Sequence, residues 1–468
     1  MDFAQLESLT ALISSSVAQL KELQSSLKTS DSSSSKSEFL KPSLQIVAAA
    51  SQLIALARTP ERYLMDLSTA HQLSSSLRVV VETNVPEILR EKGKGPKKAL
   101  HVKDIGTYNG VNHLKLGRVL RLLATHHVFD EVSPNVFANN TISYVMDTGK
   151  SLAELKAHPE EKYDGTTGIA ALVGLFSDET MHNSVFIADT LKDPATTNSF
   201  SPYDAPFSRA WEGGKHLKMY EWLSLPENRP RLKRFGMAMN GINSMTPPDA
   251  ILHGFNWSSL PEGSIVIDCG GGVGSVSLPI VQTCPQVHLI VQDTERVVAE
   301  APAFWQVNHP EAYAQGRISF QAHDFFNPQP AGNGKAAVFL LRMIMHNWPD
   351  AECIQILQRV RDCIGNNKDS RIVIVDNIML FASRDQTIEG QNTGKADPEA
   401  LAPEPLLANW GAANSLSYKQ DINMLSNHNA MERTVPEFAE LLSRTGFAIA
   451  EVHQAHQSWL PQIIAVPV

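Results

Sequence analysis

The amino-terminal part of the chain carries apolar residues at the spacing of an amphipathic helix. Apolar side chains recur every three or four residues from Leu6 to Leu20, which indicates a helix with one apolar face. Such a face must pack against another element, either the body of the chain or a second subunit. A polar, serine-rich run follows from about residue 25 to residue 37 and predicts a connector, because it is too hydrophilic to form a core.

The next stretch, residues 38–160, is predicted to be a helical domain that includes a small hairpin. Apolar residues at helical spacing indicate one helix around residues 73–81 and another around residues 116–123. The period changes over residues 128–137, where two short apolar runs flank a Ser-Pro-Asn turn. Helices followed by a hairpin indicate a winged-helix module, which serves either dimer formation and substrate enclosure or DNA binding.

From residue 264 onward, short apolar runs alternate with stretches of helical spacing. The predicted strands cover residues 264–267, 288–291, 319–321, 336–341 and 371–375. This rhythm is typical of an α/β fold with a mostly parallel sheet and helices on both faces. The predicted organisation therefore has three parts, residues 1–37, 38–160 and 161–468, and the last contains an exposed polar insertion at residues 383–405.

Composition limits the function classes. The 468 residues include 40 basic and 49 acidic side chains, and the net charge of −9 argues against a surface that coats nucleic acid or an anionic membrane. The four cysteines have neither metal-ligand spacing nor the density of a disulfide framework, so we expect no metal site and a cytoplasmic location. We also expect no signal peptide and no membrane-spanning apolar run.

The candidate chemistry begins where the first predicted strand ends, with the run D-C-G-G-G-V-G at residues 268–274. A strand that turns through such a run into a helix is where an α/β sheet holds a nucleotide-like cofactor. Glycines permit positive φ angles and let a ligand lie against the backbone. Glycine-rich turns also serve purely structural roles, so the run alone leaves both interpretations open.

Acidic residues follow the next two predicted strands. Asp293 directly follows the second, where a carboxylate either accepts hydrogen bonds from ribose hydroxyls or caps a helix. Asp324 follows the third, with Phe325 beside it. This pair suits the amino group and the ring of adenine, and the alternative for Asp324 is a turn-stabilising role.

A histidine follows the fourth predicted strand, in the run R-M-I-M-H-N-W-P-D at residues 342–350. Pro349 suits the first turn of the next helix, so His346 is expected on the loop that faces the ligand crevice. An imidazole near its ordinary pKa of about 6.5 can take a proton from a hydroxyl group at physiological pH. The alternative is a histidine with a structural hydrogen bond.

These residues, together with M-E-R-T at residues 431–434, resemble the S-adenosylmethionine-dependent O-methyltransferases of plant and fungal small-molecule metabolism, and the overall plan resembles the fungal branch. The resemblance extends from about residue 63 to near the C-terminus. It implies a winged-helix dimerisation domain, a homodimer, and a Rossmann-like C-terminal domain that binds S-adenosylmethionine. The implied reaction methylates a hydroxyl of a small aromatic or polyketide-type metabolite, without a metal, nucleic acid or membrane.

The resemblance also implies which residues hold the cofactor. They are Asp268, Gly270, Gly272, Gly274, Asp293, Asp324, Phe325 and Arg342, the last at a position that is often lysine.

Further residues correspond to the catalytic and acceptor positions of the family. His346 corresponds to the general base, and Asp376 and Glu432 to the two acidic residues that orient it. Asp376 stands where plant members commonly have glutamate, so we expect its shorter side chain to reach the imidazole less well. The substrate-binding positions that the resemblance implies are Met239, Asn347 and Met424, with the methionines on either side of the acceptor.

Two other functions stay open. Some fungal proteins that resemble these methyltransferases keep the cofactor yet catalyse dehydration or pericyclic cyclisation by polarising a carbonyl group. Arg342 and Asn347 are compatible with that chemistry, whereas His346 and the two acidic residues favour methyl transfer. A DNA-binding protein built on the winged helix is the third possibility, and the negative charge argues against it.

Overall fold

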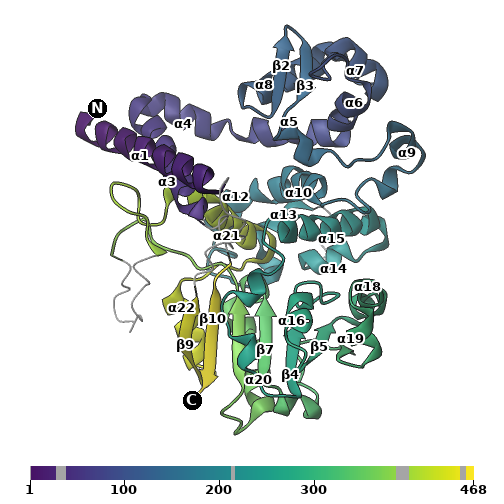
Figure 1. Cartoon of the computed structure of the whole chain (residues 1–468), viewed down its shortest axis with the longest axis vertical. Coiled ribbons are helices and arrows are strands. Elements are labelled where there is room, and N and C mark those ends of the chain that lie inside the picture. Colours follow the sequence, from purple (N-terminus) through teal and green to yellow (C-terminus); the bar gives the residue numbers. More distant parts are fainter. Residues whose placement is uncertain (1, 28–37, 212–216, 386–399, 454–459) are drawn as a thin grey trace. The chain divides into compact units, whose positions relative to one another are not determined.

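The structure, a computed structural model, describes residues 2–27, 38–211, 217–385, 400–453 and 460–468 (Figure 1). The chain divides into two compact units. One, here the sheet unit, comprises residues 1–60, 200–202 and 246–468, and the other, the helical unit, comprises residues 61–199 and 203–245. Segments far apart in sequence thus share a unit, a grouping that differs from the three consecutive parts expected from the sequence.

The sheet unit contains a seven-stranded sheet with the strand order β6-β5-β4-β7-β8-β10-β9. Its strands are β4 Ser264–Cys269, β5 Val287–Asp293, β6 Ile318–Ala322, β7 Val338–Arg342, β8 Arg371–Val375, β9 Phe447–His453 and β10 Gln462–Pro467. Strands β4 to β8 pair in parallel, and β10 pairs antiparallel with both β8 and β9. The predicted α/β class and the five predicted strands are confirmed. Strand order reverses at β4, and ligands bind at such switch points.

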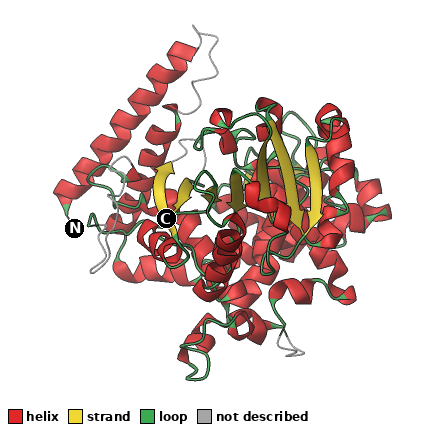
Figure 2. Cartoon of the chain, turned by 90° about the horizontal axis from the view of Figure 1, so that it is seen from below, coloured by secondary structure: helices red, strands yellow, loops and turns green. Residues whose placement is uncertain are grey.

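Helices cover both faces of this sheet (Figure 2). Alternate strand residues point to opposite faces. Ile267 and Phe339 therefore pack with α20 (Asp350–Ile364) and α22 (Val435–Ser443). Val266 and Leu340 pack with α16 (Leu278–Thr283) and α18 (Ala301–Asn308) on the other face. The α-helices of the unit are α1 Phe3–Leu27, α3 Leu40–Ala57, α16 Leu278–Thr283, α17 Glu295–Val298, α18 Ala301–Asn308, α19 Pro310–Ala314, α20 Asp350–Ile364, α21 Ser415–His428 and α22 Val435–Ser443. Short 3-10 helices include η9 Met345–Asn347 and η11 Gly411–Asn414.

The predicted N-terminal amphipathic helix is confirmed as α1, and its partner lies within the same unit. Leu9 of α1 is buried with Ala48 and Ala49 of α3 and with Ala402 and Leu406. The burial of Ala402, which is 1% exposed, corrects the prediction of an exposed insertion at residues 383–405. Residues 383–385 are exposed, and residues 386–399 of that insertion, like the connector at residues 28–37, lie outside the described residues.

Helix α3 is long and apolar enough to cross a membrane by length and composition alone. The helix is not a continuous apolar run, because Lys41, Ser43 and Gln45 interrupt it, so the expectation that no run approaches about 18 apolar residues is not contradicted. One such helix is weak evidence, because the core helices of water-exposed domains pass the same test. Ala48 and Ala49 of α3 are buried in a cluster with Leu9 of α1, whereas Val47 and Ile54 are 50% and 48% exposed.

The helical unit contains a three-stranded sheet with the order β1-β3-β2. Its strands are β1 Leu100–His101, β2 Phe129–Ser133 and β3 Val136–Asn139, and Asn135 in the turn between β2 and β3 has φ 63°. The predicted helices are α5 His71–Glu82 and α8 His113–Thr125, so both helices and the hairpin are confirmed. The winged-helix interpretation stays a prediction.

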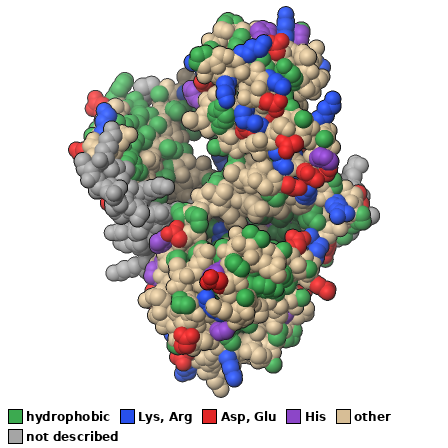
Figure 3. Space-filling view, turned by 45° about the vertical axis from the view of Figure 1, so that its right-hand side comes forward, with side chains coloured by type: hydrophobic (Ala, Val, Ile, Leu, Met, Phe, Trp, Pro, Cys, Tyr) green, Lys and Arg blue, Asp and Glu red, His purple; other side chains and the backbone are tan. Residues whose placement is uncertain are grey.

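The remaining helices of this unit complete its core. They are α4 Pro60–Ser68, α6 Val85–Lys92, α7 Val102–Asn109, α9 Leu152–Ala157, α10 Ile169–Leu175, α11 Met181–Ser184, α12 Ile187–Lys192, α13 Pro206–Ala210, α14 Met219–Leu223 and α15 Arg229–Ser244. A π-helical turn, η3 Phe176–Thr180, joins α10 to α11. On the face of the molecule in Figure 3, basic and acidic side chains of the described residues are interspersed.

Candidate active site

The glycine-rich loop after β4 is shaped by positive φ angles at Gly270, Gly272 and Gly274, of 70°, 63° and 81°. A Cβ atom at Gly274 would lie 2.8 Å from Cγ2 of Val291, so this glycine is required for packing against β5. At Gly272, by contrast, no atom lies within 4 Å of the position of a Cβ. The loop therefore leaves open space beside its backbone at Gly272, where a ligand can approach.

Asp268, at the start of the loop, is buried and accepts a hydrogen bond from Oγ of Ser277. Burial raises its pKa to about 6, against the opposing effects of the Ser277 hydrogen bond and the positive charge of Arg342. Ser277 directly precedes α16. Asp268 thus anchors the loop to the following helix, and a direct contact with the cofactor stays a prediction.

Asp293, at the end of β5, contacts the same loop. Its Oδ2 accepts a hydrogen bond of 2.9 Å from the backbone N–H of Gly272, and its Oδ1 accepts one of 2.7 Å from the N–H of Thr294. The N-cap position of α17 belongs to Thr294, which makes no side-chain cap hydrogen bond, so the helix-cap alternative for Asp293 is wrong. Oδ1 also accepts a hydrogen bond of 3.3 Å from Oγ1 of Thr294, whereas Oδ2 keeps a second lone pair, which leaves capacity for a ribose hydroxyl.

Asp324 and Phe325 follow β6. Oδ1 of Asp324 accepts a hydrogen bond of 3.0 Å from the N–H of Phe326, which is the turn-stabilising role. The ring of Phe325 lies 3.5 Å from the position of a Cβ on Gly270 and packs edge-to-face on Trp348, with centroids 6.0 Å apart. Phe325 therefore forms an apolar wall beside the glycine-rich loop, as a stacking partner for adenine would.

Arg342 is the last residue of β7. Burial lowers its pKa, although the nearby carboxylates of Asp268 and Asp376 act in the opposite direction. Its charge therefore lies between the glycine-rich loop and the end of β8. Open space at Gly272, the carboxylate of Asp293 and the ring of Phe325 together fit the polar and apolar parts of a nucleoside.

The loop after β7 carries His346. Met343 has φ 52°, a left-handed conformation that a methionine rarely adopts. Its N–H donates a hydrogen bond of 3.0 Å to the carbonyl of Val375, and its carbonyl accepts one of 2.9 Å from Nδ2 of Asn347. Asn347 thus stabilises the loop, and its predicted contact with the substrate stays a prediction. A strained loop that is held by such hydrogen bonds is typical of a functional site.

His346 is 4% exposed, and its Nδ1 lies 2.8 Å from Oε1 of Glu432. Burial alone would lower the pKa of the imidazole, but the charge and the hydrogen bond of Glu432 raise it above its ordinary value, and the charge of Asp376 adds to this effect. A carboxylate acceptor at Nδ1 favours the tautomer with a proton on that nitrogen. Nε2 is then the nitrogen that can accept a proton.

Asp376 follows β8 and is 2% exposed. Neither of its carboxylate oxygens, nor Oε2 of Glu432, has a hydrogen-bond partner of normal geometry among the described residues. Burial raises the pKa of Asp376 to about 7, against the lowering effect of His346. Of the two acidic residues expected to orient His346, Glu432 makes a hydrogen bond with the imidazole, whereas Asp376 interacts with His346 through its charge and the backbone.

Three residues near the base were not singled out from the sequence. Asp421 accepts a hydrogen bond of 2.9 Å from the N–H of Glu432, and Arg433 is 1% exposed beside it. His428, at the end of α21, is 5% exposed, and burial, with the charge of His346, lowers its pKa to about 3. The available signal was the helical spacing of four between His428 and Met424, which puts both on one face of α21.

The two methionines expected around the acceptor belong to different units. Met424 is 5% exposed in α21 of the sheet unit, whereas Met239 lies in α15 of the helical unit. Their arrangement around an acceptor stays a prediction. Within the described residues, His158, Glu160 and Glu161 are the one group whose ligand atoms lie within 4.8 Å of one another, and all three are exposed.

The fold and these residues define a class of enzyme. A parallel sheet that ends in an antiparallel β10 beside β9, with a glycine-rich loop and an aspartate at the switch point, is the class I methyltransferase fold. The O-methyltransferase domain family matches residues 227–397.

Relatives extend this match over most of the chain. An O-methyltransferase of Armillaria gallica is 37% identical over 433 residues, which is 91% of this chain and 89% of that protein. 4-O-methyltransferase 1 of Phanerochaete chrysosporium is 38% identical over 426 residues, covering 90% of this chain and 88% of that protein. The chain therefore belongs to the O-methyltransferase family, whose members use S-adenosylmethionine to methylate small metabolites.

A solved structure shows the same fold. The structure of OxaC in complex with SAH and oxaline has a TM-score of 0.67 and 20% identity, and the match covers 98% of this chain and 100% of that chain.

Proposed function

We propose that this enzyme methylates a hydroxyl group of a small aromatic or polyketide-type metabolite, with His346 as the general base. The observation that carries the proposal is the hydrogen bond of 2.8 Å between Nδ1 of the buried His346 and Glu432, which leaves Nε2 as the basic nitrogen. When bound, the cofactor supplies an activated methyl group. His346 would remove the acceptor proton, a step that contributes roughly 10²- to 10⁴-fold to the rate.

The other residues of the site would bind and orient. Asp293 and Phe325 would hold the ribose and the adenine, because Asp293 binds the backbone of Gly272 and Phe325 lies beside Gly270 of the same loop. Glu432 would stabilise the imidazolium that forms when the proton moves to Nε2 of His346. Holding two reactants in line is worth about 7 to 11 kcal/mol in favourable cases, so orientation is the larger contribution.

A flat, largely apolar acceptor suits the described part of the site. Met424, which is 5% exposed, supplies a polarizable thioether. The two curated relatives are O-methyltransferases, and one of them is named for the 4-O position. The position methylated by this enzyme is open to direct measurement with a panel of phenols.

The substitution His346→Ala tests the proposal. We expect methyl transfer to fall by roughly 10²- to 10⁴-fold, because the base is lost. Binding of S-adenosylhomocysteine, measured by calorimetry, should be retained. His288→Ala is the matched control, because His288 is exposed on β5 of the same sheet. Equal loss of methyl transfer and cofactor binding in His346→Ala would show that His346 is structural and would overturn the proposal.

Dehydration or pericyclic cyclisation, the other reaction class compatible with the sequence, gives a different outcome with labelled cofactor. A methyltransferase moves a labelled methyl group into the product, whereas a dehydratase or cyclase converts its substrate and leaves the label on the cofactor. We expect the label in the product, since His346 and Glu432 form the contact that a general base requires.

A homodimer and a cytoplasmic location are also part of the proposal. Helix α4 has no buried residue, and its Leu64, Met65 and Leu67 are 65%, 62% and 57% exposed, which supplies apolar surface for a second copy. All four cysteines are free thiols, as is usual in a reducing compartment. Analytical ultracentrifugation of the purified chain tests the dimer directly.

A further inference from the structure

Arg433 is the next residue after Glu432 and is almost fully buried, with an exposure of 1%. We propose that Arg433 is a positioning residue, which fixes the backbone on both sides of His346 and thereby the direction of Nε2. This inference rests on the proposed role of His346 as the base.

The guanidinium group of Arg433 donates hydrogen bonds to backbone carbonyls on both sides of His346 in the sequence. Its Nη1 donates a hydrogen bond of 2.9 Å to the carbonyl of Met345, the residue before His346. Its Nη2 donates one of 2.9 Å to the carbonyl of Trp348, two residues after it. Nε and Nη2 also donate to Oδ1 of Asp350, at 3.1 and 2.7 Å. One side chain thus ties three points of the loop that carries the base.

The backbone of Arg433 is itself held in place. Its carbonyl accepts a hydrogen bond of 2.9 Å from the N–H of Met379, and it forms an isolated parallel bridge with Ile378, just beyond β8. The guanidinium therefore reaches the loop from a fixed anchor. Glu432 and Arg433 together hold the imidazole by its Nδ1 and its backbone by the two flanking carbonyls.

The choice of arginine follows from this geometry. A guanidinium presents several N–H donors in a rigid, planar fork, whereas a lysine offers one compact ammonium that cannot reach separated carbonyls at once. The partner Asp350 has a side chain that is 53% exposed, so a solvent-screened ion pair does not account for the burial of Arg433. The carbonyl contacts around His346 do account for it.

The test compares two arginine-to-lysine substitutions in the sheet unit. Nη2 of Arg317 donates to the carbonyls of Val281 and Cys284, both at 2.9 Å, on elements that do not carry the base. We expect Arg433→Lys and Arg317→Lys both to lower the melting temperature. Only Arg433→Lys should lower kcat, by about 10- to 100-fold, because a displacement of about 1 Å can have that effect. Its KM values should stay close to those of the parent.

The pH profile separates positioning from general stability. The groups whose charges act on His346 are Glu432, Asp376 and His428, and all three stay in place in Arg433→Lys. A loosened contact between His346 and Glu432 should let the pKa of His346 fall toward its ordinary value. The acidic limb of kcat against pH should then move to lower pH in Arg433→Lys and stay fixed in Arg317→Lys.

A parental kcat and acidic limb in Arg433→Lys would overturn the inference, as would an equal loss of kcat in Arg317→Lys. If Arg433→Lys does not fold, Asp350→Ala replaces it, since it removes one anchor of the guanidinium at an exposed position. We then expect kcat to fall by about 3- to 10-fold and the acidic limb of kcat against pH to move to lower pH. Parental kinetics there would also overturn the inference. Failure of the proposed function shows separately, as methyl transfer that survives in His346→Ala.

Discussion

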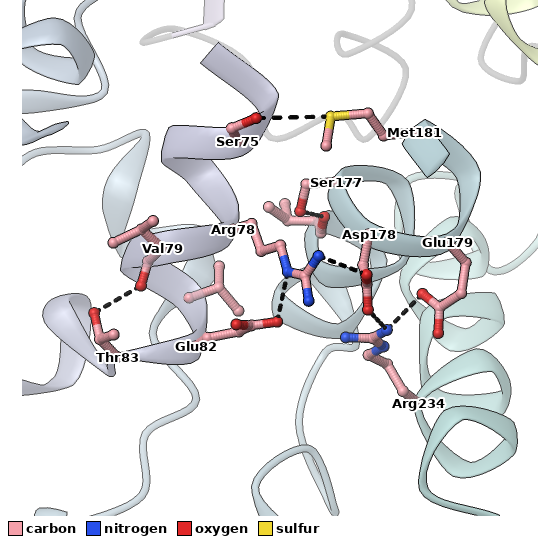
Figure 4. A network of polar contacts seen from close by, with 12 residues as sticks. Ser75, Arg78, Val79, Glu82, Thr83, Ser177, Asp178, Glu179, Met181 and Arg234 are labelled. Atoms are coloured by element: carbon pink, nitrogen blue, oxygen red, sulfur yellow. Dashed lines mark hydrogen bonds and ion pairs between the residues drawn. The ribbon is translucent and has the colours of Figure 1, made fainter. Parts of the chain in front are cut away.

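Each unit of the protein buries a cluster of charged side chains, and the two clusters differ in how completely their carboxylates are paired. In the helical unit, Oδ1 of Asp178 pairs with Arg78 at 2.6 Å and its Oδ2 pairs with Arg234 (Figure 4). Oδ2 also pairs with Arg231. The oxygens of Glu179 pair with Arg231 and Arg234. In the sheet unit, three of the four carboxylate oxygens of Asp376 and Glu432 have no hydrogen-bond partner of normal geometry among the described residues.

The difference in pairing has opposite effects on the pKa values. Although burial would raise the pKa of Asp178, the guanidinium groups around it lower it. Burial raises the pKa of Asp376 to about 7, and the positive groups near it do not offset that effect. A paired cluster keeps its charges fixed and joins α5, η3 and α15, whereas an unpaired cluster can exchange protons near neutral pH. Incomplete pairing is therefore the structural signal that separates the candidate active site from a stabilising ion network.

Breaking the paired cluster should give the largest effect. Asp178→Ala leaves three guanidinium groups with one carboxylate fewer, and we expect the free energy of unfolding to fall by about 3 to 5 kcal/mol. The folded fraction should stay active. Denaturant unfolding measures the loss, and Asp164→Ala is the control, because the pair of Asp164 with Lys233 is about 40% exposed on both sides and should contribute about 1 kcal/mol or less. A loss in Asp178→Ala no larger than in Asp164→Ala would contradict the comparison.

Changing the unpaired cluster should affect the chemistry more than the stability. In Glu432→Gln, we expect kcat to fall by about 10²-fold, equivalent to about 2.7 kcal/mol, because the imidazolium loses its carboxylate partner. The pKa of His346 is raised by Glu432, so its loss should move the acidic limb of kcat to lower pH. Glu437→Gln is the control, because Glu437 lies five residues after Glu432 and belongs to the capping box of α22. It should keep the parental kcat and the parental position of the acidic limb. An acidic limb that stays in place in Glu432→Gln would show that His346 does not titrate as the base.

The sequence predicts the sheet well, because most of its parallel strands are short apolar runs, and β4, β7 and β8 are largely buried on both faces. Strands β9 and β10 were not predicted, although Gln462–Pro467 contains an apolar run of strand length. Their pairing joins the edge of the sheet to residues near the C-terminus, and no βα rhythm marks it. The partner of α1 was open for a related reason, since Ala402 lies far away in the sequence.

The contacts of the candidate site, like those of β9, β10 and α1, could not be predicted from the sequence. His346 was a candidate base from its place after a predicted strand, and Asp376 and Glu432 were found through the resemblance to a family. Their pairing, however, depends on side-chain length and backbone direction. The carboxylate of Asp376 lies in the site and still makes no hydrogen bond with the imidazole. Arg433 stands in the motif that supplied Glu432, yet its contacts with Met345 and Trp348 exist only in the folded chain. Long-range hydrogen bonds to backbone carbonyls leave no periodic pattern in a sequence.

The smallest predicted effect is the change of the free energy of unfolding with pH that Asp376 of the unpaired cluster causes. The unfolded chain releases the proton of Asp376 near 3.8, whereas the folded protein keeps it up to about pH 7. The folded state therefore binds more protons in this window, and stability is lost as the pH rises. Between roughly pH 5 and 6.5 this linkage amounts to about 2 kcal/mol.

Asp376→Asn removes this proton linkage while it keeps the shape of the side chain. The difference in unfolding free energy between Asp376→Asn and the parent should therefore move in favour of the variant as the pH rises from 5 to 6.5, by about 2 kcal/mol. His428, whose lowered pKa gives the opposite dependence below its ordinary value, is present in both proteins and cancels in the difference. Asp178→Asn is the matched test of the paired cluster. Its difference from the parent should stay flat over this range, because a carboxylate with a lowered pKa is already ionised in both the folded and the unfolded chain.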